Sequence, residues 1–313
     1  MGKIVAAVAL SHAPGAIGFP ETAKPDARAR TEAATLSLGK TLTSARPDVI
    51  FAFLDDHFEN FYRNHMPTVA VGVAEHHVGP ADQWMEALRI KEKTYFRGAP
   101  DIAEHLLESL VDQGFDVSRT GSTEYGNNVL MPWVLMKADL PDVAIVPSTS
   151  MFHHLSLLAT GGLSHWPPYW SPYQNGDPPQ DEFLKLMKEY QTVGKSVLER
   201  VPDLFVQFDA YEVEMAKKNE YPLNSRHPLV NFEWDRKFLD KLCSGDAQWL
   251  KDLTYEEVEE EAGHGGHEVL NWVAISGAMG GKSCSLVMYE PVIEWICGMA
   301  YVDYRSRSPA RMA

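Results

Sequence analysis

Residues 3–12, KIVAAVALSH, predict a buried strand that ends in a histidine. Seven apolar residues follow Lys3 without interruption, which is typical of a strand covered on both faces of a sheet. The run is far shorter than the about 20 apolar residues that span a membrane. A signal peptide is disfavoured too, because SHAPG follows the run in place of a small-residue cleavage site. We therefore expect the fold to be built around a core strand over residues 3–10.

Similar apolar runs recur along the chain in alternation with helical patterns. Strands are expected at four further places, residues 48–54, 68–73, 142–146 and 283–289. Helices are expected at residues 27–44, 100–113, 182–200, 235–242 and 268–277. This alternation predicts an α/β fold. We expect one layered domain over residues 1–313, in which helices flank a central mixed or parallel sheet.

A segment of different composition interrupts this alternation over residues 166–227. It opens with WPPYWSPYQNGDPP, which is too rich in Pro, Gly and aromatic residues for regular structure. We interpret the segment as a lid-like excursion from the core, because it has no series of apolar strands of its own. Trp166 and Tyr169 could stack on a flat ligand there, although each could equally pack on the protein itself.

The chain carries 28 Lys and Arg against 43 Asp and Glu, a formal net charge of −15. Such an acidic surface repels a phosphate backbone, so nucleic-acid binding is not expected. No apolar run is long enough for a membrane span, so a membrane partner is not expected either. Three irregularly spaced cysteines favour neither a disulfide framework nor a thiolate zinc site, and they indicate a reduced, cytoplasmic protein.

Histidines directly follow two of the predicted strands. His12 comes after the strand at residues 3–10, and His57 comes after the strand at residues 48–54. The carboxyl ends of the strands of an open α/β sheet form its ligand-binding crevice, so these two imidazoles could share a metal ion. Each histidine alone could equally be a hydrogen-bonded residue at the end of a strand.

A third ligand is expected in residues 259–272, EEEAGHGGHEVLNW. The Gly-rich loop of this segment runs into a helix whose first turn carries Glu268, and His264 and His267 compete with it for the role. HGGHE lacks the i, i+4 histidine pair of a zincin helix, which disfavours a metalloprotease. Two histidines and one carboxylate that leave other positions open form the facial triad of non-haem Fe(II) oxygenases.

The motif ATGGLSH displays His165 just after a Gly-Gly turn. The unperturbed pKa of histidine lies near neutrality, so a histidine that faces a metal pocket can act as an acid or a base. The alternative is a loop histidine that faces water.

Taken together, these segments resemble the class III extradiol ring-cleavage dioxygenases, the family of the protocatechuate 4,5-dioxygenase β subunit and gallate dioxygenase. The motifs that carry the resemblance are SHAPG, DDHFENF, PTVAVG, ATGGLSH, NFEWDRKFLDKL and GHEVLNWVAISGAM, in this order. The resemblance implies that His12, His57 and Glu268 bind Fe(II) and that His165 is the acid/base catalyst. It also implies that Asp56, the polar residue before the second ligand, orients that ligand.

Two features depart from the family pattern. Where relatives carry a second active-site histidine in a DHG-type motif, this chain reads TEYGNNVLMPW, so Tyr125 stands in that place as a catalytic candidate. The stretch before GGLSH is short and the stretch after it is long. His153 and His154, which lie just before GGLSH, are therefore kept as reserve candidates for catalysis.

The resemblance further implies Fe(II)-dependent extradiol cleavage of a substituted catechol with insertion of both atoms of O2, as a step in aromatic catabolism. We expect an aromatic acid such as protocatechuate, gallate or 3-O-methylgallate, or a larger catechol, with Arg63 and Lys282 as candidate partners of a carboxylate. A homo-oligomer is expected, and a small partner subunit is a further expectation. The apolar segment EPVIEWICGMAYVDY could lie at an interface between copies or pack on the sheet.

Three other functions stay open at this point. Proteins of the Memo type share the same fold and bind partners without catalysis, but they depart from the iron triad that this chain keeps. A hydrolase could use zinc at the same triad, and it would work without O2. A related dioxygenase could act on an aminophenol, which only substrate tests would distinguish.

Overall fold

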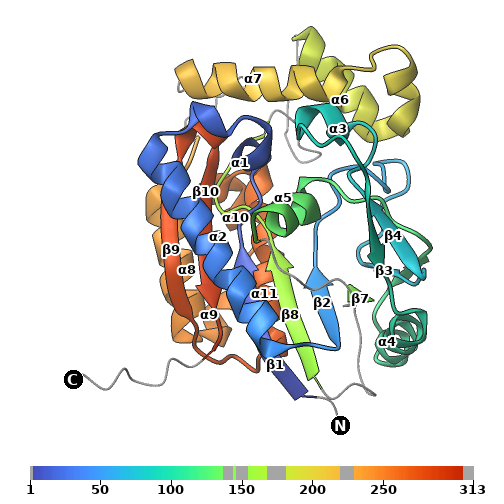
Figure 1. The fold of residues 1–313 in the computed structure, drawn as a ribbon, viewed down its shortest axis with the longest axis vertical. Helices are drawn as coiled ribbons and strands as arrows, with labels where there is room; N and C mark the ends of the chain where they lie inside the picture. Colours follow the sequence, from blue (N-terminus) through green and yellow to red (C-terminus); the bar gives the residue numbers. More distant parts are fainter. Residues whose placement is uncertain (1–2, 137–143, 146–153, 168–180, 219–228, 306–313) are drawn as a thin grey trace.

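The structure is a computed structural model that describes residues 3–136, 144–145, 154–167, 181–218 and 229–305 (Figure 1). Its centre is a six-stranded sheet with the strand order β7-β2-β8-β1-β10-β9. The strands are β1 (Lys3–Leu10), β2 (Val49–Phe53), β7 (Ala144–Ile145), β8 (His154–Thr160), β9 (Ser285–Val292) and β10 (Cys297–Asp303). β7, β2, β8 and β1 run parallel, whereas β10 is antiparallel to β1 and β9 is antiparallel to β10. The predicted α/β fold with a mixed central sheet is confirmed.

The apolar run of β1 lies in the middle of this sheet, between β8 and β10. Val8 and Leu10 pack into the core on one face, and Ala7 and Ala9 pack into the core on the other. All four side chains are at most 1% exposed. The run is therefore apolar at every position because both faces of the strand are covered.

Helices cover both faces of the sheet. The short helices α1 (Gly15–Gly18) and η1 (Pro20–Thr22) follow β1, and α2 (Pro25–Ala45) and α5 (Asn127–Met136) pack on one face. The other face is covered by α8 (Phe232–Ser244), α9 (Ala247–Asp252), α10 (Tyr255–Ala262) and α11 (Val269–Ala278). In Figure 1, α2 and α5 lie in front of the sheet and α8, α9 and α11 lie behind it. In the part of the chain that the structure describes, no helix is long and apolar enough to cross a membrane.

A smaller layer lies beside the central sheet. It holds the two-stranded sheets β3 (Ala70–Gly72) with β6 (Ser118–Thr120) and β4 (His76–Gly79) with β5 (Thr94–Arg97), and the helices α3 (Trp84–Ala87) and α4 (Pro100–Asp112). The strand expected over residues 68–73 is thus outside the central sheet. Its apolar residues Val71 and Val73 pack instead on Ala103 and Leu106 of α4, which buries them without a place in the main sheet.

The excursion forms a helical cap in its described part. α6 (Glu182–Val193), η2 (Gly194–Glu199) and α7 (Leu204–Lys218) lie across one end of the central sheet, at the top of Figure 1. The helix expected over residues 182–200 is divided at Gly194, whose φ of 76° ends α6 and begins a tighter 3-10 turn. Tyr190, Phe205 and Phe208 are buried against Trp84 of α3, so the cap is a packed layer.

Two strands of the central sheet fall where we expected none. β8 begins at the reserve candidate His154, and its sequence HLSLLAT mixes polar and apolar residues too evenly to be distinguished from a loop by pattern alone. β10 comes from the segment EPVIEWICGMAYVDY, after the short turn η4 (Ile293–Trp295). Because β10 is buried between β1 and β9, most of that segment packs within the sheet.

Candidate metal centre

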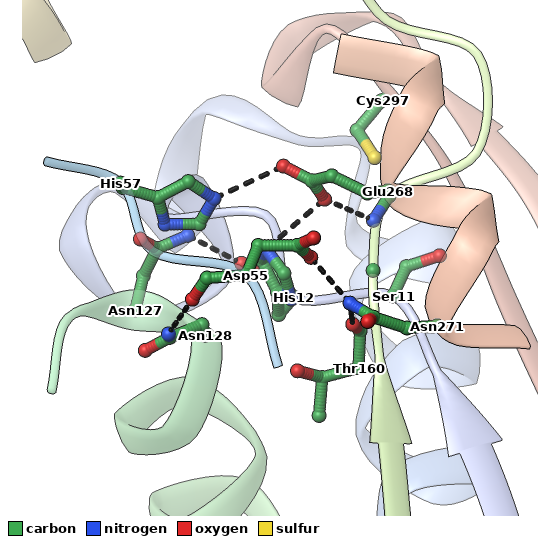
Figure 2. A network of polar contacts seen from close by, with 12 residues as sticks. Ser11, His12, Asp55, His57, Asn127, Asn128, Thr160, Glu268, Asn271 and Cys297 are labelled. Atoms are coloured by element: carbon green, nitrogen blue, oxygen red, sulfur yellow. Dashed lines mark hydrogen bonds and ion pairs between the residues drawn. The ribbon is translucent and has the colours of Figure 1, made fainter. Parts of the chain in front are cut away.

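Three side chains from distant parts of the chain meet at the carboxyl end of the central sheet. His12 follows β1, His57 follows β2, and Glu268 is the last residue of η3 (His264–Glu268), directly before α11. Figure 2 shows both imidazoles directed toward the Glu268 carboxylate. The parallel direction of β1 and β2 brings the two histidines to the same edge, as their positions after the strands predicted.

The distances between these side chains suit one divalent cation. His12 Nε2 lies 3.1 Å from Glu268 Oε2, and His57 Nε2 lies 3.0 Å from Glu268 Oε1. One ligand atom from each of the three residues lies within 4.8 Å of the others. Metal bonds to imidazole and carboxylate are about 2.0–2.2 Å long, so two ligands at a right angle stand about 3 Å apart. The three donors are therefore close enough together to bind one shared ion.

Burial and charge set the protonation of the three ligands. Burial lowers the pKa of His12, which favours the neutral imidazole that metals bind. Burial opposes ionisation of Glu268, but the neighbouring His12 and His165 outweigh it and hold the pKa of this carboxyl well below its usual range. Burial also disfavours the charged form of His57, yet the hydrogen bond and charge of Glu268 raise its pKa to about 10. Glu268 is thus the anionic centre of the cluster.

A glycine pair after β8 holds the carboxylate of Glu268 in place. The backbone N–H of Gly162 donates a hydrogen bond of 2.5 Å to Glu268 Oε2. The carbonyl of Gly161 accepts a hydrogen bond of 2.9 Å from Trp272 Nε1, which ties the same turn to α11. A Cβ atom on Gly161 would lie 2.5 Å from the carbonyl oxygen of Glu268, so only glycine permits this close approach.

His165 faces the same carboxylate from the loop after β8. Its Nε2 atom lies 3.6 Å from Glu268 Oε1, and its side chain is 12% exposed. Its Nδ1 atom lies 2.7 Å from the carbonyl of Leu163 and donates a hydrogen bond to it, so Nε2 is the atom that gains or loses a proton. Burial disfavours the charged imidazole, but the charge and hydrogen bond of Glu268 outweigh it and raise the pKa of His165. Gly265 packs directly on the ring, because a Cβ atom there would lie 2.3 Å from His165 Nε2. The structure therefore places His165 beside the three ligands, where the motif ATGGLSH predicted it.

The two aspartates before His57 have different partners. Asp56 accepts hydrogen bonds from the backbone N–H groups of Asn60 and Phe61, at 3.1 and 3.0 Å, so its carboxylate fixes the turn after His57. Asp55 was not identified from the sequence. Its carboxylate accepts a hydrogen bond of 2.7 Å from Asn271 on α11 and lies beside the ligands in Figure 2. Burial, and then the charge of Glu268, raise the pKa of Asp55 well above its usual range. In the sequence, only its place in the pair Asp55–Asp56 before His57 pointed to Asp55.

The remaining candidates lie elsewhere. Tyr125 is buried against His77 and Phe96, with ring centroids 5.7 and 5.3 Å away, and it is not part of the pocket wall described below. Trp166 packs in a separate apolar cluster with Met215. His154 begins β8, at the end of the strand opposite to the metal ligands. His153 and Tyr169 lie outside the described residues.

The two histidines that competed with Glu268 are engaged with other groups. His264 Nε2 lies 2.8 Å from the carbonyl of Pro167. His267 Nε2 lies 3.1 Å from Glu259 Oε2, and its ring stacks on Tyr255 with centroids 4.1 Å apart. Of the three candidates in η3, only Glu268 belongs to the cluster formed with His12 and His57.

A pocket lies over these side chains, with about 440 Å³ of empty space that includes the solvent at its mouth. His12, His57, His165 and Glu268 form its floor. Its walls are mostly apolar and include Trp84, Phe208, Trp295, Ile296 and Cys297. Two further polar side chains reach it, Asn127 from α5 and Glu212 from α7. Glu212 could not be identified from its sequence context, because an acidic residue in an amphipathic helix is usually solvated.

One turn before Glu212, Asp209 is buried on the same helix, and it makes the stability of the fold sensitive to pH. Burial raises the pKa of Asp209 to about 8, against about 3.9 in an unfolded chain. The folded protein thus keeps a proton that the unfolded chain releases, and stability should fall as the pH rises from about 4 to about 8. We expect Asp209→Asn to melt at the same temperature as the wild type near pH 4 and at least roughly 2 °C higher at pH 8. Calorimetry across this range checks the expectation, and a constant difference would contradict it.

The chain is similar over most of its length to proteins of known activity. The profile of a family described as the catalytic LigB subunit of aromatic ring-opening dioxygenase matches residues 6–300. A 2,3-dihydroxyphenylpropionate/2,3-dihydroxicinnamic acid 1,2-dioxygenase from Rhodococcus globerulus is 26% identical over 305 residues, covering 88% of this chain and 90% of that relative. Relatives of the same description from Photorhabdus laumondii and Cupriavidus pinatubonensis are 26% and 27% identical. They cover 85% and 93% of this chain, and 87% and 95% of their own lengths.

Proposed function

Because the chain belongs to the LigB family of aromatic ring-opening dioxygenases, we propose that it binds Fe(II) at His12, His57 and Glu268 and cleaves a substituted catechol beside its two hydroxyl groups. The chain is an extradiol ring-cleavage dioxygenase by family. Both atoms of O2 enter the product. The observation that carries the choice of metal is the donor set of two imidazoles and one carboxylate, because an Fe(II) ion held by only these three side chains would keep positions open for a catechol and O2.

The residues of the pocket supply the parts of the reaction that the metal does not. Bound at the triad, Fe(II) would acidify a catechol hydroxyl and supply the redox activity that O2 needs. His165 Nε2 accepts the proton of the second hydroxyl, and the same imidazolium returns a proton as the ring opens. Trp84, Phe208 and Trp295 enclose the aromatic ring in an apolar space, which keeps water away from the reacting atoms.

The substituent of the catechol is the finer part of the proposal. The sequence led us to expect an aromatic acid such as protocatechuate or gallate, and the relatives are named for two other carboxylated catechols. However, no Lys or Arg is found in the part of the pocket wall that the structure describes. Arg63 and Lys282, the candidate partners of a carboxylate, are both absent from that described wall. The substrate test therefore includes carboxylated catechols as one class of compound among several.

Anaerobic reconstitution with ferrous salt and ascorbate should restore turnover, and aerobic storage or chelation should remove it. The loaded enzyme is offered protocatechuate, gallate, 3-O-methylgallate, 2,3-dihydroxyphenylpropionate and an aminophenol. With its substrate we expect it to consume one O2 for each ring cleaved and to form a yellow ring-opened product. The oxygen electrode and the visible absorbance report the two quantities together.

The same assay distinguishes the competing functions. A zinc hydrolase would turn over without O2, and a binding protein of the Memo type would hold the ligand without consuming O2. Full turnover by a thoroughly chelated preparation would show that the proposed metal is wrong. The cytoplasmic location, the homo-oligomer and the small partner subunit remain predictions.

A further inference from the structure

Glu212 is a buried acid in the pocket for which the reaction described above has no use. It lies on α7, in the cap over the carboxyl end of the sheet, and its side chain is 3% exposed. Its Oε2 atom is buried and has no hydrogen-bond partner among the described residues. A buried polar atom left in this state costs free energy, so we expect a bound molecule to supply the missing partner.

The strongest charge acting on Glu212 is that of another acid, Asp209, and the charge of His57 on the pocket floor opposes it only in part. Asp209, one helical turn away, is 8% exposed, and its Oδ1 atom also has no hydrogen-bond partner among the described residues. Glu268 lies on the floor of the same pocket. Within the described wall no Lys or Arg faces these groups, and Arg89, the cation that acts on Asp209, is itself hydrogen-bonded to Glu21 on the surface.

Such a site discriminates between the substituents that a catechol can carry. A carboxyl group accepts a hydrogen bond through its carbonyl oxygen when it is protonated and through either oxygen when it is ionised. A hydroxyl or ammonium group on the ligand can therefore donate to Glu212 in both states. A carboxylate on the ligand would bind only to protonated Glu212, and it would be repelled by the other acids.

We propose that Glu212 accepts a hydrogen bond from the ring substituent of the substrate, so that the pocket selects catechols with a hydroxyl or ammonium substituent over catechols with a carboxylate. This proposal rests on the ring-cleaving function proposed above, and it narrows the substrate class of that site. Trp84, Phe208 and Trp295 hold the ring, and Glu212 determines which substituent is accepted.

Four catechols of nearly equal size test the proposal, with a methyl, hydroxymethyl, aminomethyl or carboxylate group at the same ring position. Both the 3-substituted and the 4-substituted sets are needed. Dissociation constants are measured under nitrogen on the iron-loaded enzyme by quenching of tryptophan fluorescence, and kcat/KM is then measured in air. The variants are Glu212→Leu, which removes both hydrogen-bond acceptors at similar side-chain volume, and Glu214→Leu, a control on the exposed side of the same helix.

We expect the wild type to bind the aminomethyl compound at least about 10-fold more tightly than the methyl compound, and the carboxylate least well. In Glu212→Leu this ratio of dissociation constants should fall about 10-fold, whereas Glu214→Leu should keep it. The proposal would be overturned if the wild type bound the carboxylate more tightly than the aminomethyl compound, or if Glu212→Leu weakened the binding of all four compounds equally.

Because binding and turnover are measured separately, a failure of this proposal can be distinguished from a failure of the proposed reaction. Discrimination in binding without ring cleavage would overturn the reaction and support the role of Glu212. Ring cleavage without discrimination would overturn the role of Glu212 and leave the reaction in place.

Discussion

Glu268→Gln is expected to abolish iron binding and ring cleavage together, with kcat/KM reduced at least about 1,000-fold. The substitution keeps the shape of the side chain but removes the one anionic ligand, which stands 3.0–3.1 Å from both imidazoles. A neutral amide is a poor ligand for a divalent cation, and the two histidines alone do not hold iron against a chelator. Iron content after gel filtration and oxygen uptake measure the two effects on the same sample.

Glu260→Gln is the matched control for this variant, because Glu260 is an exposed acid on α10, only eight positions earlier in the chain. It should retain full iron content and activity. Stoichiometric iron in Glu268→Gln, at the level of the control, would show that the carboxylate is not a ligand.

His165→Gln is expected to lower kcat by about 100- to 10,000-fold while iron content stays at the level of the wild type. The imidazole lies beside the cluster, with Nε2 3.6 Å from Glu268, so its removal takes away a proton acceptor and leaves the three ligands intact. Catechol binding under nitrogen should change only a few-fold, because the apolar walls hold the ring. Stopped-flow absorbance with a saturating catechol measures the slowed step.

A second variant, Gly265→Ala, displaces His165 by changing a residue that packs on its ring. The Cβ atom of Gly265→Ala would meet the ring at 2.3 Å from Nε2, so the ring must move and kcat should fall in the same direction. His105→Gln, an exposed histidine on α4, should leave kcat unchanged. Loss of iron from His165→Gln would contradict the role of acid and base and indicate a fourth ligand instead.

The strands β1 and β2 and two residues of the candidate metal centre could be predicted because local sequence determines them. The apolar runs of β1 and β2 identify buried strands, and the geometry of parallel strands then brings His12 and His57 to one edge. The choice of Glu268 over its two neighbours was open from the residues alone. It depended on the direction of each side chain in a tight turn, which residue spacing does not determine.

The parts that could not be predicted depend on contacts between distant segments. Tyr125 occupies the place of a family histidine in the chain, but it lies among aromatic side chains away from the pocket. Glu212 lies on a helix whose sequence resembles that of a solvent-exposed helix. Only the packing of the cap shows that the carboxyl group of Glu212 is buried. Both cases are decided by tertiary packing, for which a single sequence carries no direct signal.

The position of β1 has a consequence for the biosynthesis of the protein. Val8 pairs with Leu158 on one side and with Asp303 on the other, so β1 is completed by a strand that lies nearly 300 residues later in the sequence. Until β10 has been made, the edge of β1 that faces it stays open beside a continuous apolar run, and such edges pair readily with other chains. We expect nascent chains of this protein to depend on chaperones that shield the amino-terminal segment until the carboxyl-terminal hairpin of β9 and β10 emerges.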